Sequence, residues 1–259
     1  MGAIRLDLRQ AAAEGARALG PLPALDDDAR TAAIATWRGR MVNETISSRV
    51  FAALVAPMLR VPEAAPFLPR VAEAIADELR HGRQCAAVVA ALGGEACAEL
   101  DALPEVPAHE DASPREALLR NLLSVSCLSE TVAVALIGAE RLRAGPEVLR
   151  ETLGAILADE VAHARLGWEL CAALLPQTDA EERARLGAYL EVAFRHLLAH
   201  ELAHLPMGAA PSEAAVAVGV CDPEEARSLF FDTVEEVVVP RLEQLGLPGR
   251  AAWTAARGA

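Results

Sequence analysis

The sequence predicts an all-α protein in which a bundle of four long helices is followed by additional C-terminal helices. Hydrophobic residues make up 53% of the 259 residues, whereas aromatic residues make up only 3%. Ala and Leu dominate the hydrophobic fraction, and both lose little side-chain entropy in a helix. Four long segments with helical apolar spacing, each bounded by helix start or stop signals, complete the case for a bundle.

The N-terminal region predicts an arm and then a long helix. Residues 1–26 are rich in Ala, Gly and Pro, and they predict an arm that contains a short helix at 7–18. The first long helix is expected at about 28–59. Three consecutive aspartates beginning at Asp26 offer an N-cap and an acidic first turn, which the positive end of a helix dipole favours.

Three further long helices are expected in the middle of the chain. The second runs from about 66 to 94 and ends at a Gly-Gly stop signal. The proline-containing stretch 95–113 predicts a connecting loop between two helix pairs. The third helix, 114–145, begins with a Ser-Pro pair that suits a cap and a first helical position. The fourth is expected at 146–175.

The remainder of the chain predicts a fifth helix at 179–205, a short one at 212–219 and a last one at 223–245, and no β-sheet is expected. The resulting organisation is a single domain, 1–259, that consists of an N-terminal arm (1–26), a four-helix core (27–175) and additional helices (176–259).

Composition and charge exclude several classes of partner. The net charge is -13, and all basic side chains are arginines. An acidic surface repels phosphate backbones, so no nucleic-acid partner is expected. No apolar run approaches the ~20 residues that span a bilayer, and the N-terminus lacks a signal-peptide core. Five cysteines without a CxxC pair favour a reducing compartment. We therefore expect a soluble, cytoplasmic protein without a membrane partner.

Two copies of one motif carry the chemistry. They are Asp77-Glu78-Leu79-Arg80-His81 in the second helix and Asp159-Glu160-Val161-Ala162-His163 in the fourth. Residues three apart on a helix share a face, so the Glu and His of each motif point the same way. One helix earlier than each motif lies a lone glutamate, Glu44 or Glu130. Periodicity places all four glutamates on apolar faces.

Four carboxylates in one core need compensating charge. Burial of even one unpaired charge costs several kcal/mol, and the nearby cations are only Arg80 and Arg165. Two divalent ions would balance four negative charges. Carboxylate and imidazole ligands together suit iron or manganese. We therefore predict two Fe ions, with Mn as the other candidate, bound by six ligands: Glu44, Glu78, His81, Glu130, Glu160 and His163.

Over residues 28–175 this pattern resembles the ferritin-like di-iron carboxylate superfamily, in particular its oxygenases and oxidases. The resemblance implies that Asp77 and Asp159 each accept a hydrogen bond from the ligand His on the opposite helix. It also implies that Glu78 and Glu160 bridge the two ions. Arylamine N-oxygenases carry an extra His where this chain has Ile156, and the charge argues against a tRNA-hydroxylase reading, so the substrate stays open.

The function implied is that of a non-haem di-iron, dioxygen-dependent oxidoreductase acting on a small, largely apolar substrate. Its expected partners are dioxygen, that substrate and an electron-donor protein, and a homodimer is a candidate assembly. The alternative is an iron-binding or peroxide-scavenging ferritin-like protein without an organic substrate. A metal-free helical interaction module is a third hypothesis.

The fifth helix contains a second His-rich pattern, His200-Glu201-Leu202-Ala203-His204, with His196 one turn earlier. It matches the HExxH motif of zinc proteases, but a protease also needs a substrate cleft with an edge strand. The pattern is otherwise a source of an extra metal ligand, a lid over the metals, or an exposed stripe of histidines. The sequence favours the last of these.

Overall fold

The computed structural model describes residues 4–100, 102–103 and 105–258, and in this part of the chain the regular elements are helices except for two short strands. The long helices are α2 (Asp27–Met58), α3 (Leu68–Ala91), the continuous run α4 (Pro114–Leu122), η2 (Leu123–Ser129) and α5 (Glu130–Arg143), and α6 (Glu147–Leu174). All four lie within a few residues of the predicted positions. Asp26 caps α2 by accepting a hydrogen bond from the Ala29 N–H at 2.8 Å.

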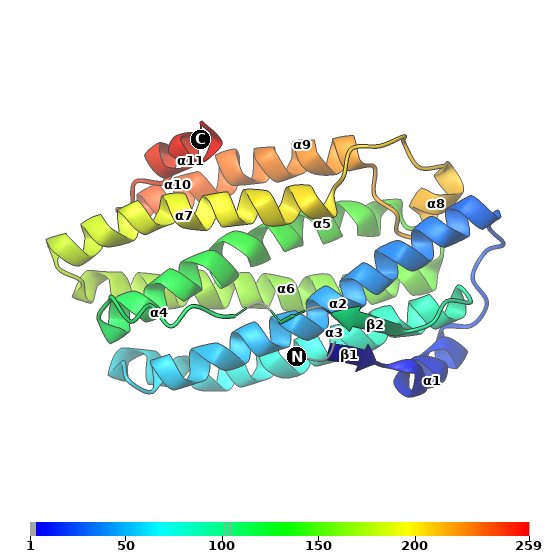
Figure 1. Cartoon of the computed structure of the whole chain (residues 1–259), viewed down its shortest axis with the longest axis horizontal. Helices are drawn as coiled ribbons and strands as arrows, with labels where there is room; N and C mark the ends of the chain where they lie inside the picture. Colours follow the sequence, from blue (N-terminus) through cyan, green and yellow to red (C-terminus); the bar gives the residue numbers. More distant parts are fainter. Residues whose placement is uncertain (1–3, 101, 104, 259) are drawn as a thin grey trace.

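The four long helices form two packed pairs, α2 with α3 and α5 with α6 (Figure 1). The pairs meet where α3 contacts α6 and where α4, the first part of the run that continues into α5, contacts α2. The run from α4 to α5 points in the same direction as α3 in Figure 1. The connection between α3 and α4 therefore has to return along the length of the bundle, as a crossover does.

The third long helix contains a π-helical segment, η2, that ends directly before Glu130. The wider turn is visible in the backbone N–H of Glu130, which donates to the carbonyl of Val125, five residues back. A π-helical turn shifts the direction of the side chains that follow it. The sequence predicted one continuous α-helix here, so this local change of direction was missed.

The N-terminal arm corrects the expectation that the chain has no β-structure. Strand β1 (Ile4–Asp7) pairs antiparallel with β2 (Cys97–Leu100), and helix α1 (Arg9–Leu19) follows β1 and packs on α3. Arg5 lies opposite Glu99 in this register. Each strand is four residues long, and the two are joined by a long-range contact, so local sequence signals could not predict them.

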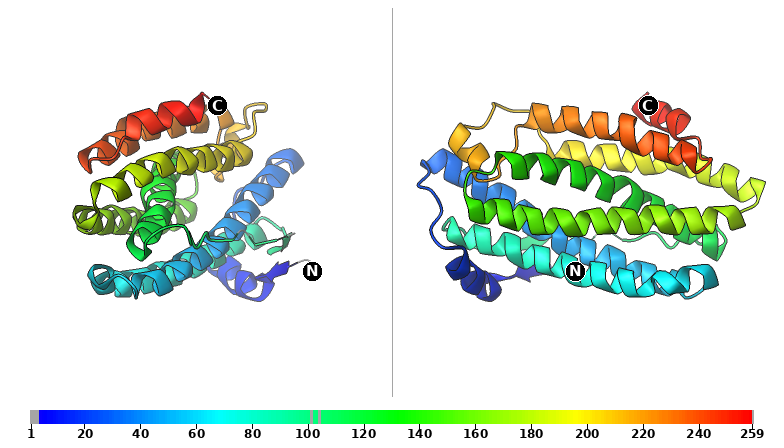
Figure 2. Two further views of the ribbon diagram at one scale, coloured as in Figure 1. Left: turned by 60° about the vertical axis from the view of Figure 1, so that its left-hand side comes forward. Right: turned by 180° about the vertical axis from the view of Figure 1, so that it is seen from behind.

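The C-terminal helices cover one side of the bundle (Figure 2). They are α7 (Ala180–His204), α8 (Glu213–Ala217), α9 (Pro223–Thr233), the π-helical η4 (Val234–Val238), α10 (Val239–Gln244) and α11 (Gly249–Arg257); two 3₁₀ segments, η1 (Pro62–Phe67) and η3 (Leu175–Gln177), complete the described elements. α7 to α10 match the prediction, but α11 was not predicted. This short helix packs on α7 and buries Trp253.

The hydrophobic core has two separate clusters, one on each side of the predicted metal ligands. One contains Phe51 of α2 and Cys171 of α6, and the other contains Met41 of α2 and Ile156 of α6. Glu44 and Glu160 lie between these positions on the same helices. A polar layer thus interrupts the core, whereas hydrophobic packing alone would favour one continuous cluster.

Within the described chain one helical run, Pro114–Arg143, is long and apolar enough by length and composition to cross a membrane. Core helices of soluble proteins pass the same test, and 44% of its most apolar window is buried in this fold. The expectation that no segment approaches a membrane-spanning length therefore has this one exception.

Candidate metal centre

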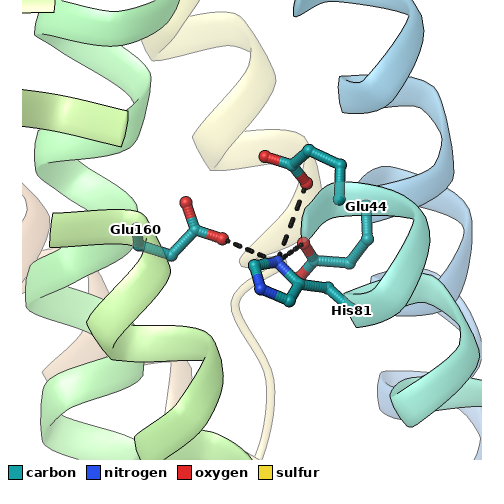
Figure 3. Close-up of side chains that lie close together, drawn as sticks. Glu44, His81 and Glu160 are labelled. Carbon is teal, nitrogen blue, oxygen red and sulfur yellow. Dashed lines mark ion pairs between the residues drawn. The ribbon is translucent and has the colours of Figure 1, made fainter. Parts of the chain in front are cut away.

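All six predicted ligands converge at the middle of the bundle. Glu44 comes from α2, Glu78 and His81 from α3, Glu130 from α5, and Glu160 and His163 from α6. Figure 3 shows Glu44 and Glu160 pointing toward the ring of His81 from two different helices. Five of the six are buried, and the Glu44 side chain is 14% exposed. The apolar stripes that predicted their inward direction are buried as well, for example Trp37 and Met41 on α2.

His81 directs one ring nitrogen into the cluster and the other away from it. Its Nδ1 lies 3.3 Å from Glu160 Oε1 and 3.4 Å from Glu44 Oε2. Its Nε2 lies 2.9 Å from Asp159 Oδ2. Because Asp159 accepts a hydrogen bond from the Nε2–H group, the Nδ1 atom can face the glutamates with its lone pair.

His163 repeats this arrangement in the opposite direction. Its Nδ1 lies 3.3 Å from oxygens of both Glu78 and Glu160, and its Nε2 lies 3.3 Å from Asp77 Oδ2. Asp77 is on α3 and holds a histidine of α6, whereas Asp159 is on α6 and holds a histidine of α3. The cross-helix pairing that the resemblance implied is present on both sides.

The donor atoms form two overlapping groups, each compact enough for one ion. One group is Glu44, Glu78, His81 and Glu160, and the other is Glu78, Glu130, Glu160 and His163; within each, the donor atoms lie within 4.8 Å of one another. Glu78 and Glu160 belong to both groups. Two ions in these positions would share these two carboxylates, as expected of bridging ligands.

The arginines near the cluster do not neutralise its glutamates. The sequence left open that Arg80 or Arg165 pairs with a glutamate of the cluster. Instead Arg80 Nη2 lies 2.7 Å from both Asp77 Oδ1 and Asp159 Oδ2. Arg165 lines a separate groove beside Trp168. Arg80 therefore offsets the charge of the two aspartates, and neither arginine offsets the charge of the four glutamates.

Outside the cluster, a buried carboxylate has hydrogen-bond partners that are all protein groups. Glu116 is fully buried and accepts a hydrogen bond from Arg120 at 2.6 Å and another from Arg185 at 2.9 Å. In the cluster, by contrast, Glu78 Oε2 and His81 Nδ1 are buried and have no hydrogen-bond partner among the described residues. Buried polar atoms are normally satisfied, so the orphaned pair fits a bound cation.

The metal-free cluster retains protons. Burial raises the pKa of Glu78 to about 8, although His163 lowers it in part. Burial also raises the pKa of Glu130, and the charge of Glu160 adds to that effect. Although burial lowers the pKa of His81, the carboxylates of Glu160 and Glu44 raise it to about 11. Protons thus take the place that cations would fill, which is the expected behaviour of an acidic metal site.

A cavity of about 610 Å³ opens onto the cluster. All four glutamates contribute to its wall, and it extends between α2 and α5 past Ala133 and Ile137. Its far end is formed by the segment around Val220. Most of this wall is apolar, with Arg40 and Glu140 as a charged pair along it. Local sequence patterns do not predict which residues line this cavity.

The His-rich end of α7 lies along the same cavity. His200, Glu201 and His204 line it, although both histidines are exposed residues. The His200 and His204 rings are 4.3 Å apart between centroids, and burial raises the pKa of Glu201 to about 7. Neither compact donor group found in the described chain includes these residues. They form an exposed stripe beside the cavity rather than part of the cluster.

The chain was compared with protein-family models, curated proteins and solved structures, and none of them matches it.

Proposed function

We propose that this protein is a non-haem di-iron, dioxygen-dependent oxidoreductase with a ferritin-like four-helix bundle. Two Fe ions would be held by Glu44, Glu78, His81, Glu130, Glu160 and His163, with Mn as the other candidate metal. The observation that carries the proposal is the pair of compact donor groups that share Glu78 and Glu160. Oxygen and imidazole donors in this number suit a redox-active first-row metal.

The chain's own residues have separate tasks in this proposal. Bound ferrous ions would supply the electrons that reduce dioxygen. Asp77 and Asp159 hold the Nε2–H of the two histidines, so that each Nδ1 lone pair faces an ion. Glu78 and Glu160, which belong to both donor groups, would be ligands of both ions. The apolar part of the cavity wall would limit the water near the reacting atoms.

The cavity favours an oxygenase or oxidase over an iron-storage or peroxide-scavenging protein. A protein without an organic substrate has no need for a half-open, mostly apolar cavity of about 610 Å³ beside its metals. That volume falls in the range of small-molecule sites, roughly 300–1,000 Å³. The substrate expected from the wall composition is small and largely apolar.

Metal content is the first test. Protein produced with added iron is expected to contain two Fe per chain by elemental analysis, and the E78Q/E160Q variant is expected to contain almost none because both shared ligands are lost. E169Q, which changes an exposed glutamate of α6, serves as the matched control and should keep the wild-type content. Wild-type protein with almost no bound metal would support a metal-free interaction module instead.

Reaction with dioxygen is the second test. Anaerobic ferrous protein is mixed with dioxygen and followed by stopped-flow absorbance. A transient visible band whose decay accelerates when small apolar compounds are present is expected for an oxygenase. Rapid conversion to ferric protein followed by mineral growth, with no response to any added compound, would favour iron storage.

A further inference from the structure

The cavity contains one charged pair that the metal centre does not use. Arg40 of α2 and Glu140 of α5 both line it, and Arg40 Nη2 lies 2.5 Å from Glu140 Oε1. The two side chains are only 17% and 13% exposed. An ion pair with so little solvent around it costs desolvation energy that its own attraction does not reliably repay. The pair lies outside the two donor groups of the metal centre, so its presence in the cavity wall calls for a separate functional explanation.

Arg40 is held firmly by contacts that need no ligand. Its guanidinium lies 4.8 Å from the ring centroid of Trp37, and its Nη2 also donates to the carbonyl of Gly219 at 3.2 Å. The indole N–H of Trp37 in turn donates to the carbonyl of Val218 at 2.7 Å. The guanidinium is thus fixed in one orientation before anything binds, which lowers the entropy cost of binding.

Each member of the pair has one polar atom left over. Arg40 Nη1 and Glu140 Oε2 are both buried and lack a hydrogen-bond partner within the described parts of the chain. One is a cationic donor and the other an anionic acceptor. The two groups that carry these atoms are neighbours, because Arg40 Nη2 is in contact with Glu140 Oε1. A ligand that satisfies both needs an acceptor with negative charge next to a donor with positive charge.

We infer that Arg40 and Glu140 bind the α-carboxylate and the α-ammonium group, respectively, of a free amino acid with an apolar side chain. Arg40 lies one helical turn, about 6 Å along the axis, from Glu44. The side chain of the bound amino acid would extend along Ala133 and Ile137 toward the four glutamates. The inference names the substrate class of the cavity and in that respect rests on the proposed function.

Ligands with one charge fit the pair less well. A simple carboxylate would satisfy Arg40 Nη1 and place negative charge beside Glu140, and an amine would do the reverse. A buried polar group left unpaired costs binding affinity, so both should bind more weakly than the zwitterion. A neutral primary amide offers a donor and an acceptor without charge, and it is the closest competitor.

The test uses metal-free wild-type protein and four probes of similar size: L-norvaline, pentanoate, butylamine and pentanamide. Binding is measured by ligand-observed NMR and by calorimetry. L-Norvaline is expected to bind about tenfold or more tightly than pentanoate or butylamine, because each of these lacks one charged hydrogen bond. Equal or tighter binding of any other probe, or no binding of L-norvaline at millimolar concentration, would overturn the inference.

Variants of the pair locate the site. R40Q is expected to lose L-norvaline binding by about tenfold or more, and E140Q is expected to reduce the preference for L-norvaline over pentanoate. R70Q is the matched control, because Arg70 also pairs with a glutamate on a neighbouring helix, Glu169, outside this cavity. If R40Q does not fold, R40K keeps the positive charge but has only one donor nitrogen in place of the two terminal nitrogens of the guanidinium. It should therefore lose L-norvaline binding as well. Full binding by a folded R40Q or R40K variant would exclude this site.

Metal content is measured in parallel on iron-supplemented preparations of the same proteins, so that the two ideas fail separately. If iron loads and L-norvaline does not bind, only the amino-acid inference falls. If L-norvaline binds and iron does not load, the proposed function falls, and the cavity remains an amino-acid site. The R40Q variant should keep its full iron content, because Arg40 is outside both donor groups.

Discussion

At the scale of single residues, the cluster differs from the other buried charges by the way it is satisfied. Glu116 is neutralised by two arginines. The four glutamates of the centre have only two histidines near them, and those histidines already donate to aspartates. Four carboxylates in the core are unfavourable for folding unless protons or a cation offset their charge, and the donor atoms of the cluster could hold such a cation.

The aspartates behind the histidines should control metal affinity. In D159N the amide cannot accept the Nε2 proton of His81 as strongly, so the ligand nitrogen becomes less basic; D77N does the same to His163. We expect each variant to lose about 10–100-fold in metal affinity while it stays folded. The measurement is titration with ferrous ion under anaerobic conditions.

The control for this experiment is D232N, which alters an exposed aspartate of α9. It should bind iron as the wild type does. Because Asp77 and Asp159 each serve one histidine, either single variant should weaken mainly one of the two sites. Unchanged affinity in both D77N and D159N would show that the hydrogen bonds have no part in metal binding.

At the scale of helices, the centre depends on the close approach of α6 to the π-helical segment η2. A Cβ atom on Gly167 would lie 2.3 Å from the Cβ of Ser126 and 2.9 Å from its backbone carbon. Only glycine fits there. Ser126 precedes Glu130 by about one helical turn, and Gly167 follows His163 by about one turn. The contact between them therefore sets the spacing between two helices that carry predicted ligands.

The G167A variant should separate α6 from η2. We expect a loss of about 1–3 kcal/mol in the free energy of unfolding, measured by chemical denaturation, because overpacking a tight contact forces the backbone to move. The iron content should fall as well, since Glu130 and His163 would no longer be held at the same spacing.

G138A, which changes a glycine of the neighbouring helix α5, is the matched control. A Cβ atom on Gly138 meets nothing within 4 Å, and alanine is the better helix former. It should therefore leave stability unchanged or raise it slightly. If G167A were as stable as G138A, the close approach would not be a constraint on the fold.

At the scale of the whole molecule, the polar layer separates two hydrophobic clusters and links the two halves of the bundle. The halves each supply a lone glutamate and a motif of the Asp-Glu-x-x-His type, and the Asp–His hydrogen bonds cross between α3 and α6. Bound ions would add four-donor links at the same level. Stability should therefore depend on metal and on the protonation of this layer.

The metal-free protein should lose stability as the pH rises from about 6 to about 9. The pKa of Glu78 is raised from 4.5 to about 8, that of His163 from 6.5 to about 10, and that of His81 from 6.5 to about 11. Folding therefore favours the protonated form of each, and this contribution is lost as the pH rises toward the folded-state values. Burial raises the pKa of Glu160, but the neighbouring histidines lower it overall, so its contribution changes only below about pH 4.5.

Thermal unfolding measured with and without iron checks this prediction. The melting temperature of the metal-free protein should fall across that pH range, whereas bound iron, which requires deprotonated ligands, should raise it more at the higher pH. E78Q mimics the protonated side chain, so its metal-free form should show a shallower fall. A metal-free melting temperature that rose toward pH 9 would contradict the proton assignment of the cluster.

The sequence by itself determined the long helices and the identity of the candidate ligands. Helical periodicity placed Glu44, Glu78, Glu130 and Glu160 on apolar faces, and these faces are buried in the fold. The caps and stop signals located the long helices to within a few residues, because such signals act through neighbouring backbone groups. Such local patterns depend only on residues that are close together in the sequence, so they can be recognised without the fold.

Only the tertiary structure decided which groups meet and what space remains between them. The strand pair, the π-helical turn before Glu130, the pairing of Arg80 with two aspartates, and the cavity with Arg40 and Glu140 all arise from contacts between distant segments. Such contacts depend on how all the helices pack together, and no local pattern of residues predicts them. The direction of each ligand was therefore predictable, and the charge balance around it was not.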